Sequence, residues 1–488
     1  MSIESRDRPR LSFATLPGDI AKPAYARDPT RNGIVHLGLG AFHRAHQAVY
    51  TDDAIAAGDT GWGIVGVSMR SAAVRDALMP QDCLYMVEER AASGQHRRLI
   101  GALNSALVAP EEPDKVIAAL SDPAVHVVTL TVTESGYHRD PGSNRLLVDA
   151  ADVAHDLSGG APRTIFGFLA TALDRRAASQ AGPLTILSCD NMPDNGRLLG
   201  GLLTDYLDAR GQGTPDGWTT PSSMVDRIVP ATTAEDIARL PVEDRGLTVC
   251  EPFRQWVIED RFAGPRPAWE AGGAQIVDDV RPFELAKLRL LNGAHSALAY
   301  WGLPLGHAYV HQAIRDKELA AFVRRQLLLE AAPSLPRSRS LDAASYVEAI
   351  FRRFDNPALP HRLAQIAMDG SQKLPQRWLA TVVERDARGE RSPAHISSIA
   401  GWLAFVGERA NAGELVADPL AARLRDIWTS RGEPAGIARA MIQSSGVFPA
   451  VFCQKEHLCR QVEHALADIL TRGLRFAMTA SLRESQSD

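Results

Sequence analysis

The pattern of apolar and polar positions changes close to residue 282. Before it, short apolar runs rich in β-branched residues alternate with polar turns, which is typical of buried strands. After it, apolar positions recur at helical spacing over longer segments. The sequence therefore predicts an α/β domain over residues 1–282 and a mostly α-helical domain over residues 283–488.

The individual elements follow from the same pattern. Strands are predicted at 33–40, 63–69, 126–133, 184–189, 223–230 and 250–260. Helical segments are predicted at 41–57, 283–300, 313–332, 341–354, 376–387, 394–407, 418–431 and 457–481. A length of 488 residues agrees with more than one domain, because single cores rarely grow beyond about 250–300 residues.

The first predicted strand runs into a glycine turn and then into a helix. This order is typical of dinucleotide-binding folds, in which the pyrophosphate lies at the N-terminus of the helix. Gly38 and Gly40 occupy the first two positions of the glycine fingerprint, but His43 stands where the third glycine is usual. The early position of the turn, directly after a buried strand, favours a doubly wound sheet with a dinucleotide site.

The second predicted strand ends without the acidic residue that usually binds the adenosine ribose of NAD. The residue that follows is Arg70, which suits the 2′-phosphate of NADP or is simply solvated. Local chemistry thus leaves NAD and NADP both open.

Polar turns follow two further predicted strands. Thr133 and Glu134 lie at the end of strand 126–133, and Asn191 follows strand 184–189. Ligands of doubly wound sheets bind beyond the carboxyl ends of strands, so these turns are expected to line a site. Taken alone, Asn191 is better interpreted as a simple turn former.

The helix predicted at 283–300 carries unusual polar residues. At about 100° per residue, Glu284, Lys287, Asn292 and His295 fall on one arc of a largely apolar helix. Burial of such groups costs free energy unless they have partners, and it would lower the pKa of the lysine towards that of a general base. Taken singly, a lysine reaching the surface and a hydrogen-bonded core histidine are the simpler interpretations.

A second polar segment lies at 368–377. Pro375 is expected to open a helix there, because proline is favoured in the first helical turn. Lys373 and Arg377 would then flank the helix N-terminus, a favourable place for an anionic group. Two solvated cations at a helix start are the competing interpretation.

Composition and charge argue against several classes of function. With 45% hydrophobic residues, 23% charged residues and a net charge of −5, the chain offers no electrostatic case for nucleic acid or an anionic membrane. No apolar run approaches the roughly 18 residues of a membrane span, and residues 1–17 lack the apolar core of a signal peptide. Five scattered cysteines predict a reduced, cytoplasmic protein, and Cys453, His457 and Cys459 match no zinc spacing, so no metal is expected.

Six motifs, in order along the chain, resemble those of the long-chain mannitol dehydrogenase and fructuronate reductase family. They are 34–47 (IVHLGLGAFHRAHQ), 131–137 (TVTESGY), 188–191 (SCDN), 224–230 (MVDRIVP), 251–260 (EPFRQWVIED) and the spacing of Lys287, Asn292 and His295. The resemblance covers nearly the whole length. It implies an expanded Rossmann domain followed by a mostly helical domain, with the active site between them.

The resemblance also implies an activity and roles for the matched residues. It implies a metal-free, nicotinamide-dependent dehydrogenase acting at a secondary alcohol or ketone. Lys287 would be the general base or acid, Asn191 and Asn292 would hold the oxygen that gains negative charge, and His295 would position the substrate. Glu284 would control proton exchange with solvent, and Asp226 would line the substrate pocket. The expected cofactor site comprises Gly38, Leu39, Gly40, Ala41, Phe42, Arg70, Thr133 and Glu134, with NAD favoured by the family.

Several alternatives remain at this stage. The 369–377 and 251–256 segments resemble the fructuronate reductase branch, which favours D-mannonate and D-fructuronate, with Lys373 and Arg377 binding the carboxylate. Mannitol or another polyol is the alternative substrate. A 6-phosphogluconate-type oxidative decarboxylase and a non-catalytic dinucleotide-binding regulator are more remote. We expect a small-molecule substrate and a monomer or small homo-oligomer.

Overall fold

The computed structural model describes residues 8–430 and 432–483. These residues form two compact units, one ending at Val280 and the other beginning at Arg281. Part of the polar N-terminal stretch, residues 1–7, lies outside the described residues, as does Arg431 at the end of the predicted helix 418–431.

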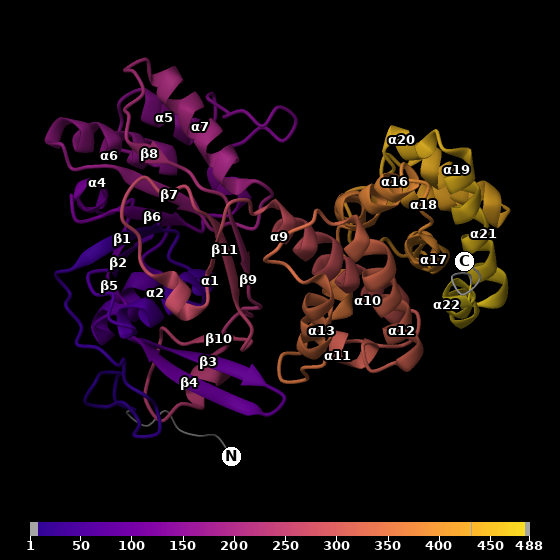
Figure 1. Cartoon of the computed structure of the whole chain (residues 1–488), viewed down its shortest axis with the longest axis horizontal. Coiled ribbons are helices and arrows are strands. Elements are labelled where there is room, and N and C mark those ends of the chain that lie inside the picture. Colours follow the sequence, from indigo (N-terminus) through magenta and orange to yellow (C-terminus); the bar gives the residue numbers. More distant parts are fainter. Residues whose placement is uncertain (1–7, 431, 484–488) are drawn as a thin grey trace. The chain divides into compact units, whose positions relative to one another are not determined.

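The first unit is built on a six-stranded sheet (Figure 1). In spatial order the strands are β5 (Leu103–Val108), β2 (Gly63–Ser68), β1 (Asn32–Leu37), β6 (Val127–Leu130), β7 (Leu184–Ser188) and β8 (Trp218–Thr219). All five pairings in this sheet are parallel. The direction of winding reverses between β1 and β6, so the predicted doubly wound sheet is confirmed.

Helices cover both faces of this sheet. The helices of the unit are α1 (Ala41–Ala45), α2 (Gln47–Ala56), α3 (Ala73–Leu78), η1 (Met79–Gln81), α4 (Pro113–Ser121), η2 (Glu134–Tyr137), α5 (Ala151–Leu157), α6 (Ile165–Ser179), α7 (Asn195–Arg210), α8 (Ala234–Ala238) and η3 (Trp269–Gly272). Apolar residues of α4, α6 and α7 share one core with the sheet, and those of α1 and α2 share another. Burial on both faces explains why the strands read as continuous apolar runs.

The helix predicted at 41–57 is interrupted at His46, which has φ −126° and ψ −87°. The carbonyl oxygens of Arg44 and Ala45 accept hydrogen bonds from the Tyr85 hydroxyl at 2.9 Å and from Arg227 Nη1 at 2.6 Å. These side chains come from distant segments and compete with the amides that would continue the helix. The result is two helices, α1 and α2.

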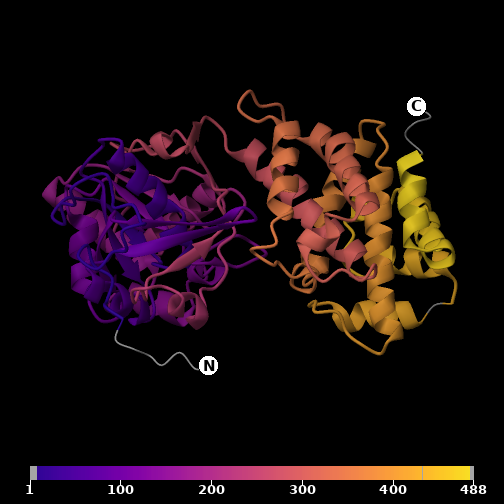
Figure 2. The ribbon, with the colours of Figure 1, turned by 90° about the horizontal axis from the view of Figure 1, so that it is seen from below.

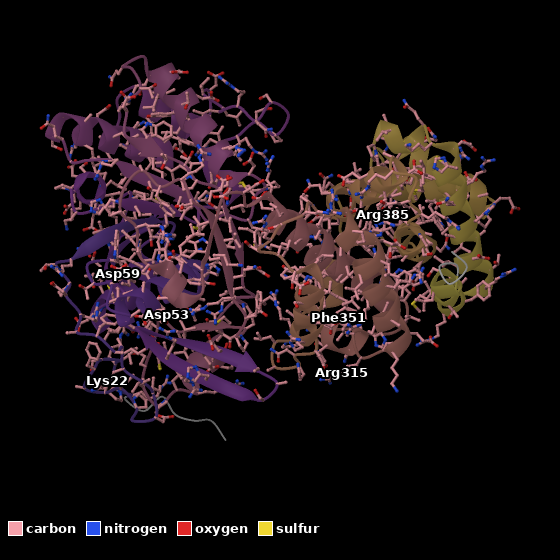
Figure 3. The ribbon with its side chains drawn as sticks, in the orientation of Figure 1. Lys22, Asp53, Asp59, Arg315, Phe351 and Arg385 are labelled. Carbon is pink, nitrogen blue, oxygen red and sulfur yellow. The ribbon has the colours of Figure 1, made fainter. Side chains whose placement is uncertain are left out.

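Two small sheets complete the first unit. One joins β3 (Tyr85–Ala91), β4 (Gly94–Ile100) and β10 (Thr248–Cys250), and the other joins β9 (Ser223–Asp226), β11 (Gln255–Glu259) and β12 (Gln275–Val277). The single strand predicted at 250–260 is thus two strands in different sheets, separated at Pro252, which has no N–H to donate. Asp53 of α2, labelled in Figure 3, pairs with Arg98 of β4 and with Arg254, and so ties the first small sheet to α2.

The second unit is mostly helical, and Figure 2 shows it from salmon through orange to yellow. Its helices are α9 (Arg281–Ala286), η4 (Lys287–Asn292), α10 (Gly293–Gly302), α11 (Val310–Ala313), α12 (Lys317–Arg325), η5 (Gln326–Ala331), η6 (Ala332–Ser334), α13 (Ala343–Phe354), α14 (Leu363–Ile366), α15 (Gly370–Leu374), η7 (Pro375–Leu379), α16 (Ala380–Asp386), α17 (Pro393–Asn411), α18 (Ala421–Thr429), α19 (Pro434–Ser444), α20 (Ala450–Cys453), α21 (Glu456–Arg472) and α22 (Leu474–Arg483). The longest, α17, packs against α10, α18, α21 and α22. Among the described helices, none has the length and apolar character needed to span a membrane.

Candidate active site

The glycine loop after β1 is shaped by the end of β6. Gly38 has φ +99°, and a Cβ at this position would lie 2.1 Å from the carbonyl oxygen of Thr131. The Thr131 hydroxyl donates to the Gly38 carbonyl oxygen at 2.9 Å. Only glycine therefore fits at position 38, and the two loops at the switch point of the sheet are held together.

The other predicted cofactor residues of this loop differ in what they offer a ligand. The N–H of Leu39 donates to a carbonyl at the end of β2 at 3.0 Å, and its side chain is buried, so both serve the fold. A Cβ on Gly40 would meet only the Gly38 carbonyl oxygen, at 3.7 Å, which leaves open space over the loop. Ala41 and Phe42 follow in the first turn of α1, where backbone N–H groups have no acceptor inside the helix. This arrangement fits a pyrophosphate.

His43, the departure from the glycine fingerprint, packs against His36 of β1. The two rings are stacked, with centroids 3.4 Å apart and planes inclined by 13°. Both are buried, and burial lowers the pKa of His36 to about 3 and the pKa of His43 well below its usual value. In dinucleotide-binding folds the third glycine usually lets the helix pack closely on the strand. Here the stacked rings of His43 and His36 make the contact between α1 and β1.

Three predicted cofactor residues gather at the neighbouring turns. Thr133 and Glu134 are exposed on the turn after β6, and Arg70 is exposed after β2. Arg70 Nη2 donates to the Ser135 hydroxyl at 3.3 Å, and the Thr133 and Ser135 hydroxyls are 3.1 Å apart. These residues lie on either side of the glycine loop, because β1 stands between β2 and β6 in the sheet.

Asn191 and Asp226 also belong to the first unit, and a buried asparagine connects their strands. The Asn195 side-chain amide donates to the carbonyl oxygens of Asp190 and Ser223, at 2.9 and 2.8 Å. Asn191 is exposed just beyond β7, whereas Asp226 is buried at the end of β9. Asn195 was not predicted as a site residue, and its only signal in the sequence is its place shortly after a strand, at the start of a helix.

Lys287 and Asn292 are the first and last residues of η4, which is a π helix. In the regular helix predicted at 283–300, residues five apart would be separated by roughly 140° around the axis. A π helix pairs residues five apart, so Lys287 and Asn292 lie on the same side, and the Gly293 N–H donates to the carbonyl of Leu288. Lys287 and Glu284 are both half-buried, so the predicted burial of the lysine is only partial.

His295 lies one turn further along, in α10. Its ring stacks on Phe354, with centroids 4.2 Å apart, and meets His361 edge-on at 5.2 Å. The residue as a whole is half-buried, but its Nε2 atom is enclosed and has no hydrogen-bond partner among the described residues. Burial lowers the pKa of His295 well below its usual value, so the ring is neutral near pH 7. An enclosed nitrogen of this kind suits a ligand hydroxyl. Neither ring around it was foreseen, since both are distant in sequence.

Lys373 and Arg377 lie four residues apart on a continuous helical run formed by α15 and η7. Lys373 Nζ donates to the Met368 carbonyl at 2.6 Å, and Arg377 Nη1 donates to the Asn292 carbonyl at 3.1 Å and the Ser296 hydroxyl at 2.8 Å. Burial lowers the pKa of Arg377 to about 10 and also lowers that of Lys373, with the neighbouring Arg377 charge contributing. Within the described part of the chain, neither cation forms an ion pair with a carboxylate. Arg377 thus touches the residue that ends η4.

The predicted start of this helix is wrong. The run begins at Gly370, because Asp418 accepts hydrogen bonds from the Ser371 N–H at 2.7 Å and from its hydroxyl at 2.6 Å. Pro375 lies inside the run, where η7 is a π helix. A wider turn accommodates the missing N–H and the ring of an interior proline. Lys373 is therefore within the helix and does not precede it.

Among the described residues, no group of three or more histidine, cysteine, aspartate or glutamate side chains could hold a metal ion. The cysteines are free thiols, and all but Cys453 are buried.

Comparison with known proteins places these observations in a family. A family model for the mannitol dehydrogenase Rossmann domain matches residues 32–271, and one for the mannitol dehydrogenase C-terminal domain matches residues 279–470. A D-mannonate oxidoreductase of Escherichia coli is 36% identical over 94% of this chain and 98% of its own. A mannitol 2-dehydrogenase of Pyrenophora tritici-repentis is 39% identical over 83% of this chain and 75% of its own.

A solved structure has a similar fold over nearly the whole chain. The Pseudomonas fluorescens mannitol 2-dehydrogenase, in a ternary complex with NAD and D-mannitol, is 31% identical, with a TM-score of 0.79 over 97% of this chain and 100% of that one. The two matched domains together cover most of the chain and lead to one assignment. The chain belongs to the mannitol dehydrogenase family of oxidoreductases.

Proposed function

We propose that the chain is an NAD-dependent oxidoreductase that interconverts the secondary alcohol and the ketone of a sugar acid, with D-mannonate and D-fructuronate as the pair. The observation that carries the choice of a sugar acid is the pair of partly buried cations Lys373 and Arg377, which form no ion pair among the described residues. Partly buried charges are usually paired, and a substrate carboxylate would supply the missing negative charge.

The proposed cofactor fits the glycine loop. Bound NAD would accept a hydride from the alcohol, and NADH would return it to the ketone. The open space over Gly40 and the first-turn amides of α1 would receive the pyrophosphate, while Thr133 and Glu134 line the neighbouring turn. NAD in the solved relative supports the choice of cofactor. Arg70 is exposed and could contact the 2′-phosphate of NADP, so we expect a lower activity with NADP as well.

The side chains divide the remaining work. Lys287 would take the hydroxyl proton in oxidation and return it in reduction. The amide groups of Asn191 and Asn292 would donate hydrogen bonds to the oxygen that becomes an alkoxide, and Asp226 would contact the substrate. His295, held neutral by burial, would bind a substrate hydroxyl through its enclosed Nε2. Glu284, on the helix that leads into η4, would exchange the Lys287 proton with solvent.

Gly40→Val should weaken cofactor binding strongly without disturbing the fold. The backbone at Gly40 has φ −108° and ψ −176°, which valine adopts easily, and a Cβ has space. The added side chain would occupy the space over the loop and block the approach of a pyrophosphate. Titration of NADH by fluorescence should show at least about a tenfold loss of affinity, equal to 1.4 kcal/mol. Gly18→Val, at an exposed glycine with free space around it, is the control. Unchanged NADH affinity in Gly40→Val would remove the assignment.

Lys373→Met should discriminate between the two substrate classes. Loss of a charged hydrogen bond is worth about 1.5–3 kcal/mol, so kcat/KM for fructuronate should fall roughly ten- to a hundredfold. Activity on fructose, which has no carboxylate, should change much less. Steady-state assays at 340 nm on both substrates, with Lys317→Met at an exposed lysine as the control, measure the difference. Equal losses on both substrates would show that Lys373 is structural.

A neutral polyol is the second candidate, because a relative that binds D-mannitol has a similar fold and comparable identity. A panel of sugar acids, polyols and ketoses assayed with NAD and NADP decides between them. Carbon dioxide release during turnover would instead indicate an oxidative decarboxylase, and tight NADH binding without turnover of any substrate would indicate a regulator.

The free thiols support a cytoplasmic location.

A further inference from the structure

The turn after β6 contains a residue in a backbone conformation that side chains rarely adopt. Thr133 has φ +65° and ψ +165°, a region occupied almost only by glycine. Such a conformation costs free energy and persists only where the surroundings impose it. The turn is joined to the glycine loop through Thr131, so its shape bears directly on the space beside Gly38.

Asp190 supplies the surroundings that impose this conformation. It is buried, follows β7 and directly precedes Asn191. One carboxylate oxygen accepts from the Thr133 N–H at 2.9 Å, and the other accepts from the Val132 N–H at 3.1 Å and from the Tyr137 hydroxyl at 2.8 Å. A single carboxylate therefore holds two consecutive amides of the turn, and Tyr137 orients that carboxylate from within the core.

We propose that Asp190 is a positioning residue that holds the turn 131–134 in the shape that receives the cofactor and joins this turn rigidly to Asn191. The inference rests on the proposed function. A carboxylate is required because both of its oxygens accept hydrogen bonds, whereas an asparagine would direct an NH₂ group at one of the backbone N–H groups. Cofactor binding and the placement of the Asn191 amide then depend on the same side chain.

A double-mutant cycle tests this role. Asp190→Asn should weaken NADH binding by about tenfold in the wild-type background, the loss expected for a charged hydrogen bond. In the Thr133→Gly background the same change should cost less than about threefold, because glycine adopts the conformation without help. NADH affinity is measured by fluorescence for all four proteins, at a temperature well below their Tm values. Equal losses in both backgrounds would overturn the inference, since a merely structural role would not depend on residue 133.

A second variant keeps the test informative if Asp190→Asn fails to fold. Tyr137→Phe removes one of the three donors to the carboxylate but keeps the buried ring. It should weaken NADH binding by about threefold, and this loss should disappear with Thr133→Gly; persistence of the loss would count against Asp190. Wild-type protein that binds no NADH would overturn the proposed function and this inference together. Normal NADH binding without coupling between positions 190 and 133 would overturn the inference alone.

Discussion

Replacement of Lys287 by alanine should reduce turnover by about 10³–10⁴-fold in both directions while NADH binding is kept, because general acid–base catalysis supplies up to about that factor. Lys287 opens the π helix, and Asn292, the proposed donor to the alkoxide, lies on the same side at its other end. Oxidation needs the neutral amine, so its rate should rise with pH in the wild type. Reduction needs the ammonium ion, so its rate should fall over the same interval. Lys287→Ala should lose both trends.

The decisive measurement is the pH–rate profile of Lys287→Ala, with and without added small amines. Amines should restore part of the oxidation rate, because they can take the place of the missing base. Lys317→Ala, at an exposed lysine of α12, is the matched control and should keep the wild-type profile. His295 would be a weak replacement for this base, since burial lowers the pKa of its imidazole well below the usual value. A wild-type profile in Lys287→Ala would show that the proton takes another route.

Asn191→Ala and Asn292→Ala should each lower kcat by about 10²–10³-fold, with little change in NADH affinity. The estimate follows from the loss of one hydrogen-bond donor to an oxygen that gains negative charge in the transition state. Asn292→Asp should be more damaging than Asn292→Ala, because it places a negative charge where the alkoxide forms. A role in packing alone would give the opposite order, since aspartate keeps the shape of asparagine.

Steady-state and single-turnover kinetics of these variants separate chemistry from product release. Asn32→Ala, at the other end of β1 from the glycine loop, is the control and should retain wild-type kcat. Losses below about threefold in both Asn191→Ala and Asn292→Ala would remove them as oxyanion donors. A large loss in only one would assign the role to that residue.

The elements of the Rossmann domain that could be predicted are those whose cause is local. The strands β1, β2, β6 and β7 are continuous apolar runs because both faces of the sheet are covered, and each prediction overlaps its strand closely. The glycine turn at Gly38 could be predicted from the sequence, because its backbone requires glycine. Its φ is positive, and a Cβ would clash with the carbonyl oxygen of Thr131. The hairpin of β3 and β4 was missed, since its strands are mostly polar along β4 and depend on their pairing.

Two of the mispredicted helix boundaries share one physical cause. At His46 the helix breaks because the Tyr85 hydroxyl and the Arg227 guanidinium take carbonyl oxygens that the next turn needs. At Gly370 a helix starts early because Asp418 receives the Ser371 amide. Each donor or acceptor comes from a distant part of the chain, and periodicity along a segment contains no information about such a partner.

The chemistry of the site divides in the same way. The residue types and their order, with Lys287, Asn292 and His295 close together in sequence, were enough to recognise a family and to name the reacting groups. The tertiary structure decided how those groups are presented: a π turn aligns Lys287 with Asn292, and Phe354 and His361 surround His295. The tertiary structure also places Asp190 where it accepts a hydrogen bond from the Thr133 N–H, in a backbone conformation that threonine rarely adopts. Local sequence sets propensities worth fractions of a kcal/mol per residue, whereas buried hydrogen bonds from remote residues are worth about 1 kcal/mol or more each and prevail where the two conflict.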